Sequence, residues 1–247
     1  VNFNDNGGTS LAGIFTGEGD DVINVLNSGS TGLTIGASAG VDRITINNPT
    51  GTAPISAQGG LGDDFFNVVN SGFGDILLMG LAGDDTYTVG LVDAGISFRI
   101  EDTVGSENDT LIGTGTAGDD VISIGSTNAN VNGAGWTVIG VENYDFLGLA
   151  GNDIFNIDMA SGWNGNLIVR GNAGNDQFIV TNSGQGMIDL QGGAGDDYYE
   201  VHFGTTTNVT ITDTIGSEND SFKGVGTGAA DVFDLSAGTA TVNGVSI

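Results

Sequence analysis

Short alternations of apolar and polar residues recur along the chain, each directly after an acidic turn. They are clearest at residues 22–25, 65–68, 86–89 and 154–157, where every second residue is apolar. A period of two is typical of a strand with one buried face. We expect two layers of inward side chains: Ile23, Phe66, Tyr87, Phe155, Phe178 and Tyr199, followed by Val25, Val68, Val89, Ile157, Val180 and Val201.

A polar turn and a second short apolar run follow each of these strands. The turns at 70–72 and 182–184 read Asn-Ser-Gly, and the second runs include 76–78, 167–169 and 188–190. No stretch has a helical period of useful length. Turn, strand, turn and strand within about 21 residues make one coil of a repeat fold. The sequence therefore predicts an all-β fold without helices, a parallel β-roll or β-solenoid of about 11–12 coils.

A longer repeat of about 111 residues contains this short one. The segment 102–109 returns almost unchanged as 213–220. We therefore read residues 1–247 as one solenoid domain, with a partial unit at 1–41, a unit at about 42–152 and an incomplete unit at 153–247. A slice of a longer array and a subunit that stacks end to end both fit this pattern.

Composition narrows the possible functions. The chain has 31 acidic residues against 4 Lys and Arg, a net charge of −27, which opposes binding to nucleic acid or anionic lipid. No apolar run is long enough to cross a bilayer. The absence of Cys and the single His exclude disulfides, thiolate sites and a His-based zinc cluster. Since 38% of the residues are hydrophobic, the chain can bury a core once the acid repulsion is neutralised, which suggests a divalent cation.

The acidic turns share a nine-residue pattern: small or Gly, Gly, any, Gly, Asp or Asn, Asp, any, large apolar, any. Residues 59–67 and 192–200 are complete copies. Near copies contain the pairs Asp20-Asp21, Asp84-Asp85, Asp119-Asp120, Asn152-Asp153 and Asn175-Asp176. Glycine permits a sharp turn and exposes carbonyl oxygens, and the aspartate adds a carboxylate. Stacked turns of this kind can surround Ca²⁺, which takes 6–8 oxygens in irregular geometry, better than Mg²⁺.

The nonapeptide resembles the glycine-rich calcium repeat of RTX (hemolysin-type) proteins, G-G-x-G-x-D-x-U-x. Members of that family fold as a parallel β-roll with Ca²⁺ between successive turns. The resemblance implies that the acids in the sixth position bind the metal: Asp21, Asp42, Asp64, Asp85, Asp109, Asp120, Asp153, Asp176, Asp197, Asp220 and Asp231. It also implies backbone carbonyl ligands near Gly60, Gly62, Gly83, Gly151, Gly174, Gly193 and Gly195.

The spacing of the repeats departs from that family. RTX nonapeptides run in tandem, with calcium on both edges of the roll, whereas these are mostly solitary. We therefore expect one calcium column along one edge. The pairs Asp109/Asp120 and Asp220/Asp231 are 11 residues apart and allow acids on both edges. For the first acid of each turn, a solvated turn residue is the simpler interpretation, because Asn152 and Asn175 replace it.

These features predict a secreted or bacterial cell-surface structural protein that folds on several Ca²⁺ ions, such as an adhesin, a surface-layer protein or a filament subunit. The expected partners are further copies of the same repeat, and surface polysaccharide is a further candidate. We expect neither nucleic-acid binding nor membrane insertion.

Two other functions stay open: the C-terminal secretion module of an exported hydrolase, and a carbohydrate-binding or lyase β-helix. Trp136 and Trp163 could form a sugar-stacking platform, although packing is the simpler interpretation. We expect no enzyme activity, because the four basic residues lie outside the acidic turns and β-helix lyases need cations to stabilise developing charge. His202 is not expected to be catalytic, and Arg43, Arg99 and Arg170 are expected to pair with acids.

Overall fold

The chain is all-β in the computed structural model. The structure describes residues 1–5, 12–27, 29, 32–48, 50–70, 72, 74–91, 98–102, 108–203, 208–212, 219–226, 233–236, 239–242 and 245–246. These contain no helix, and stacked parallel strands form a β-solenoid of about nine turns with roughly 22 residues per turn. The expected 11–12 coils are too many, because acids only 11 residues apart cannot each begin a turn of this length.

The chain divides into two compact units. Unit 1 comprises residues 1–114 and 127–143, and unit 2 comprises residues 115–126 and 144–247. In the part of the chain that the structure describes, no helix has the length and apolar character needed to span a membrane.

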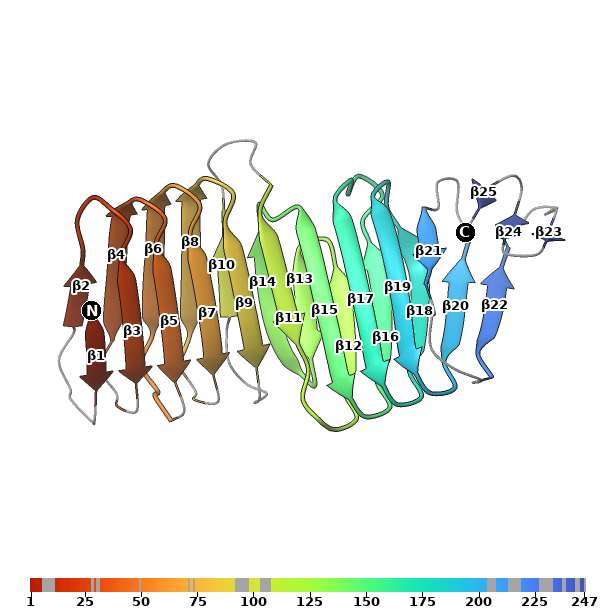
Figure 1. Ribbon diagram of the computed structural model, residues 1–247, viewed down its shortest axis with the longest axis horizontal. Coiled ribbons are helices and arrows are strands. Elements are labelled where there is room, and N and C mark those ends of the chain that lie inside the picture. Colours follow the sequence, from red (N-terminus) through yellow and green to blue (C-terminus); the bar gives the residue numbers. More distant parts are fainter. Residues whose placement is uncertain are drawn as a thin grey trace. The chain divides into compact units, whose positions relative to one another are not determined.

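Each turn of unit 1 gives one strand to each of two sheets (Figure 1). The first sheet is, in order, β1 (Asn2–Asp5), β3 (Val22–Asn27), β5 (Arg43–Asn48), β7 (Phe65–Asn70), β9 (Thr86–Leu91) and β11 (Thr110–Thr114). The second is β2 (Ala12–Phe15), β4 (Leu33–Ala39), β6 (Ile55–Leu61), β8 (Ile76–Ala82), β10 (Phe98–Glu101), β14 (Ala134–Ile139) and β13 (Asn128–Val131). Successive turns pair in parallel and in register, so equivalent residues lie over one another.

Unit 2 has the same arrangement of strands. One sheet is β15 (Asn143–Ala150), whose first residue belongs to unit 1, then β17 (Asn166–Ala173), β19 (Met187–Ala194) and β21 (Val209–Ile211). The other is β12 (Val121–Gly125), β16 (Ile154–Met159), β18 (Gln177–Ser183), β20 (Tyr198–His202) and β22 (Ser221–Val225). A small antiparallel sheet follows, with β23 (Phe233–Ser236), β24 (Thr239–Val242) and β25 (Val245–Ser246).

One hairpin interrupts the parallel pairing within unit 1. Strands β13 and β14 are antiparallel and are joined at Asn132 and Gly133, whose φ angles are 52° and 90°. Asn-Gly favours a two-residue hairpin because both residues tolerate positive φ. The local sequence reverses the chain here, where the repeat alone predicts a parallel strand.

The inward layers are as the alternation predicts. All twelve expected residues are buried, with exposures from 0 to 3%. Because the turns stack in register, equivalent rings lie face to face: Phe155, Phe178 and Tyr199 form a ladder in unit 2 with ring centroids 5.0 Å apart. Phe66 and Tyr87 stack at the same distance in unit 1. This spacing matches the separation of neighbouring strands in a sheet.

Candidate functional site

The second acid of an acidic turn, which we call the inner acid, is buried in the solenoid in most turns; the exceptions among the described residues are Asp21, which is half-buried, and Asp220, which is exposed. Asp64 is 0% exposed, as are its counterparts Asp42, Asp153 and Asp176. The cause is the period of two in the strand that follows. Asp64 shares its face with Phe66 and Val68, so all three side chains point inward. The even spacing between the acid and the inward apolar residues can be read from the sequence, and it predicts a buried carboxylate at every complete copy of the nonapeptide.

The inner acids of unit 1 form a hydrogen-bonded column. The backbone N–H of each inner acid donates to Oδ1 of the inner acid in the next turn, at 2.7–2.8 Å: Asp21 to Asp42, Asp42 to Asp64, Asp64 to Asp85, and Asp85 to Asp109. The N–H of Asp109 donates to Oε2 of Glu142 at 3.1 Å. We call these six residues the unit 1 column. Charge-assisted bonds of this kind are stronger than neutral ones and fix the stacking of the turns.

A second column runs through unit 2. The N–H groups donate to Oδ1 at 2.7–2.9 Å in the order Asp120 to Asp153, Asp153 to Asp176, Asp176 to Asp197, and Asp197 to Asp220. We call these five residues the unit 2 column. The structure thus brings ten of the eleven expected acids into two columns, one in each unit. Asp231 lies outside the described residues.

The other carboxylate oxygen of the inner acids is enclosed. Oδ2 is buried and has no hydrogen-bond partner in the described structure at Asp42, Asp64, Asp85, Asp153 and Asp176. At Asp64, Asp85, Asp153 and Asp176 it faces the first glycine of the nonapeptide, whereas the Asp42 turn has Ala37 at that position. A Cβ placed on Gly59, Gly148 or Gly171 would lie 2.0 Å from Oδ2 of the inner acid of the same turn. Glycine at this position therefore makes room for the carboxylate.

Burial changes the acidity of the columns. It raises the pKa of Asp64 and Asp153 to about 6 and that of Asp176 to about 7, and it also raises the pKa of Asp42. The backbone N–H on Oδ1 partly opposes this shift, and the charges of neighbouring acids add to it. Buried ionised carboxylates without a counter-charge are costly. The columns therefore require protons or cations to neutralise them.

The first residue of each pair, the outer acid or amide, forms a separate exposed ladder. Its Oδ1 accepts the backbone N–H of the equivalent turn position about one coil later, for example Asp119 from Asn152 at 2.7 Å and Asn175 from Asp196 at 2.9 Å. Other bonds of the same kind are accepted by Asp20, Asp63, Asp84, Asn152 and Asp196. Since asparagine serves equally, this ladder needs an acceptor oxygen and not a charge.

Asp119 allows a direct test of this distinction. Asp119→Asn keeps the acceptor for the Asn152 N–H and should change the free energy of unfolding by less than about 0.5 kcal/mol. Asp119→Ala removes the acceptor and should cost about 1 kcal/mol. Urea unfolding of both variants measures the difference. A loss in the asparagine variant equal to that in the alanine variant would show that the outer charge itself is needed.

The turn glycines pack directly on one another. The seven glycines expected to offer carbonyls all have positive φ, between 110° and 137°. A Cβ on Gly174 would lie 1.7 Å from the carbonyl oxygen of Gly151, and one on Gly195 would lie 2.0 Å from that of Gly174. The close stacking of turns therefore requires glycine at Gly174 and Gly195 whether or not a cation binds there. The position of Gly60 and Gly193 is less strict, because its equivalents Ser38, Leu81 and Asn172 also adopt positive φ.

Two further acidic residues, the half-buried Glu142 and the buried Asp102, meet the unit 1 column and were not among the sequence predictions. Glu142 ends the unit 1 column, and its signal is the alternation of Tyr144 and Phe146 that follows it. Asp102 approaches two inner acids: carboxylate oxygens of Asp85, Asp102 and Asp109 all lie within 4.8 Å of one another. The sequence signal for Asp102 is the repeated segment 102–109: Asp102 and Asp109 recur together as Asp213 and Asp220 in the second long repeat.

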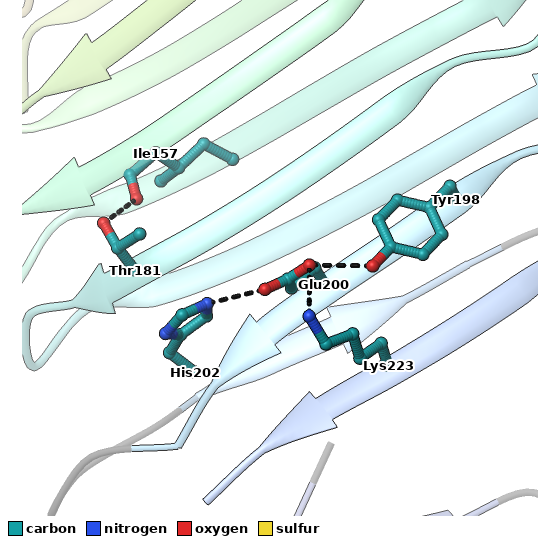
Figure 2. Close-up of polar contacts among 6 residues, drawn as sticks. All are labelled: Ile157, Thr181, Tyr198, Glu200, His202 and Lys223. Atoms are coloured by element: carbon teal, nitrogen blue, oxygen red, sulfur yellow. Dashed lines mark hydrogen bonds and ion pairs between the residues drawn. The ribbon is translucent and has the colours of Figure 1, made fainter. Parts of the chain in front are cut away.

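The basic side chains are engaged by the chain itself. Arg99 pairs with Glu101 and Arg170 with Asp145, as expected, whereas Arg43 lies over the ring of Phe65 at 4.2 Å. Figure 2 shows the remaining cluster on β20 and β22, where Glu200 accepts from three residues: Tyr198 at 2.7 Å, His202 at 2.9 Å and Lys223 at 3.0 Å. These bonds lower the pKa of Glu200 to about 2. The cluster joins neighbouring strands on the outer face.

The tryptophans are packed inside. Trp136 is 2% exposed and lies against Phe98, and Trp163 is 9% exposed and stacks on Tyr144. Neither presents a flat exposed ring on which a sugar could stack, so the packing interpretation is the correct one.

No protein-family model and no curated protein sequence matches this chain.

Proposed function

We propose that this chain is an extracellular structural repeat protein whose solenoid is stabilised by Ca²⁺ bound along the two columns. The observation that carries the proposal is the buried Oδ2, which recurs without a hydrogen-bond partner at Asp42, Asp64, Asp85, Asp153 and Asp176 in the described structure. One such oxygen per turn, at the same place in each repeat, gives a row of buried negative charges. Cations bound at equivalent positions along the column would neutralise these charges.

The donor set suits calcium among the common cations. Carboxylate and carbonyl oxygens are hard ligands, and Ca²⁺ tolerates the irregular arrangement that a solenoid turn provides. The RTX-like nonapeptide supports the same ion. When bound, the cation would supply the counter-charge that the inner acids lack, and its binding free energy would become folding free energy.

Calcium dependence favours a location outside the cell. Sites of the extracellular class have Kd values of about 10⁻⁴–10⁻³ M and fill only where calcium is millimolar. A protein of this kind would be poorly folded in the low calcium of the cytosol, where it is synthesised, and stably folded after export into millimolar calcium. The fold class fits a scaffold, as in an adhesin, a surface layer or a filament, and further copies of the repeat are the proposed partners. No catalytic role is proposed.

Far-UV circular dichroism tests the proposal. At neutral pH the chelator-stripped chain should show a weaker β-signal and a lower Tm than the calcium-bound chain. The β-signal should increase cooperatively on titration with Ca²⁺, and Mg²⁺ at the same concentration should produce a much smaller increase. If the β-spectrum is complete without metal and thermal unfolding is unchanged by millimolar Ca²⁺, the columns are neutralised by protons alone and the proposal fails.

A further inference from the structure

Among the turns that the structure describes, the one that contains β9 and β10 has a third acid in its interior. Asp85 and Asp109 are successive members of the unit 1 column, and Asp102 follows β10 from the opposite sheet. All three belong to unit 1, and all are buried, with exposures of 1, 3 and 4% for Asp85, Asp109 and Asp102. Asp102 is not part of either column.

The three carboxylates converge on one point. One oxygen from each lies within 4.8 Å of the other two, and among the described residues no second group of this kind occurs. Gly80 gives a measure of the space. A Cβ there would lie 1.9 Å from Oδ2 of Asp85, 2.5 Å from Oδ2 of Asp102 and 2.4 Å from the Tyr87 hydroxyl oxygen. These oxygens therefore face the same small volume, which only glycine leaves open.

One oxygen in this cluster has no hydrogen-bond donor while the acids are ionised. Oδ1 of Asp85 accepts the N–H of Asp64 at 2.7 Å, and its buried Oδ2 faces the Asp102 carboxylate, with which Asp85 forms a hydrogen bond only when one of the two acids is protonated. Asp102 cannot satisfy it while both are ionised, because two carboxylates have no hydrogen to share. A proton or a cation between them is required.

Tyr87 holds Asp102 in position. The Tyr87 hydroxyl donates to Oδ2 of Asp102 at 2.7 Å and accepts the backbone N–H of Gly80 at 2.7 Å. Its ring is fixed by stacking on Phe66, 5.0 Å away. The Tyr87 hydroxyl, on a ring held in place by stacking, therefore fixes the orientation of the Asp102 carboxylate toward Asp85.

We infer that Asp85, Asp102 and Asp109 form one discrete buried site for a hard divalent cation of calcium size, with Tyr87 as its positioning residue. This inference rests on the proposed calcium-dependent function and adds to the periodic columns a three-carboxylate site at one turn. The oxygen spacing suits the ion: ligands on opposite sides of Ca²⁺ at about 2.4 Å lie about 4.8 Å apart. Three carboxylates around one ion should make it the tightest site in the chain.

The sequence repeats this set of residues. Gly80, Asp85 and Tyr87 correspond to Gly192, Asp197 and Tyr199, and a Cβ on Gly192 would lie 2.1 Å from Oδ2 of Asp197 and 2.2 Å from the Tyr199 hydroxyl oxygen. The counterpart of Asp102 is Asp213, which lies outside the described residues. Glycine, aspartate and tyrosine are thus kept together in the same geometry.

Calcium binding to the purified chain, measured by isothermal titration calorimetry with Asp102→Asn, tests the site. Asparagine keeps the acceptor for Tyr87 and leaves both columns intact, so this variant should lose the tightest site, or bind it at least about 10-fold more weakly, and retain the others. The matched control, Asp158→Asn on the exposed face of β16, removes the same charge and should bind like wild type. Tyr87→Phe is the second variant, to be used if Asp102→Asn does not fold. It keeps the ring stack on Phe66, removes the hydroxyl that positions Asp102, and should weaken the same site.

The outcomes separate this inference from the proposed function. If wild type binds several ions and both Asp102→Asn and Tyr87→Phe bind the same number with unchanged affinity, the discrete site is wrong and the columns stand. If wild type binds no Ca²⁺ at millimolar concentration, the proposed function and the site both fail. If Asp102→Asn loses one tightly bound ion and Asp158→Asn binds like wild type, the result supports the site.

Discussion

Raising the pH from 5 to 8 should lower the Tm of the calcium-free protein by on the order of 10 °C. Burial raises the pKa of several inner acids, to about 6 for Asp64 and Asp153 and to about 7 for Asp176, and it also raises the pKa of Asp85. A folded-state pKa above the unfolded value means that the folded state binds protons more tightly. This stabilisation is complete below about pH 4 and is lost as the pH rises through these values.

The magnitude follows from the number of groups. Each unit of raised pKa corresponds to about 1.4 kcal/mol, so a few buried acids acting together amount to several kcal/mol. Thermal unfolding in metal-free buffers from pH 4 to 8 measures the effect. Saturating Ca²⁺ should remove most of the decrease, because the cation replaces the protons that are lost.

Two variants separate the columns from general acid repulsion. Asp176→Asn removes one buried titration and should flatten the pH dependence, whereas Asp158→Asn, on an exposed face, should leave it unchanged. A pH profile that is equally steep in wild type and Asp176→Asn would show that the decrease comes from the surface charge, and not from the columns.

Gly174→Ala should destabilise the protein by about 3–5 kcal/mol. Gly174 has a φ of +134°, which side chains rarely adopt, and its Cβ would lie 1.7 Å from the carbonyl oxygen of Gly151. The clash is with backbone, so it can be relieved only by separating two turns. Urea unfolding, with calcium present and then absent, measures the loss.

Gly162→Ala is the matched control. It lies in a turn of the same unit, has no strained φ, and has no heavy atom within 4 Å of the added Cβ. Its effect should stay within about 0.5 kcal/mol. Similar losses in the two variants would mean that the stacking of the glycine turns does not limit the stability of the solenoid.

The architecture could be predicted because the repeat fixes it locally. Alternation identifies the strands and their inward residues, and the recurrence of the acidic turn gives the length of one coil. The hairpin at Asn132 and Gly133 interrupts that regularity, and a repeat-based interpretation overlooks it although the dipeptide is a strong hairpin signal. Local turn chemistry determines the chain direction there.

The site could be predicted only in part. The spacing of the repeat predicts the acids as a series, but their orientation follows from the alternation of the strand behind them: Asp64 lies two residues before the inward Phe66 and therefore also points inward. Glu142 meets Asp109 across 33 residues of sequence, and Asp102 meets Asp85 across 17, so both contacts join different strands of the solenoid. Spacing along the chain cannot show such contacts, since loop length decides which turn meets which.

Diffraction from crystals grown in Ca²⁺, with data collected for the anomalous signal of calcium, would locate the bound ions. We expect anomalous density beside the buried Oδ2 atoms of both columns, and the strongest peak among Asp85, Asp102 and Asp109. Density confined to surface carboxylates, with the interior of both columns free of metal at millimolar calcium, would contradict this expectation and leave protons as the only counter-charge.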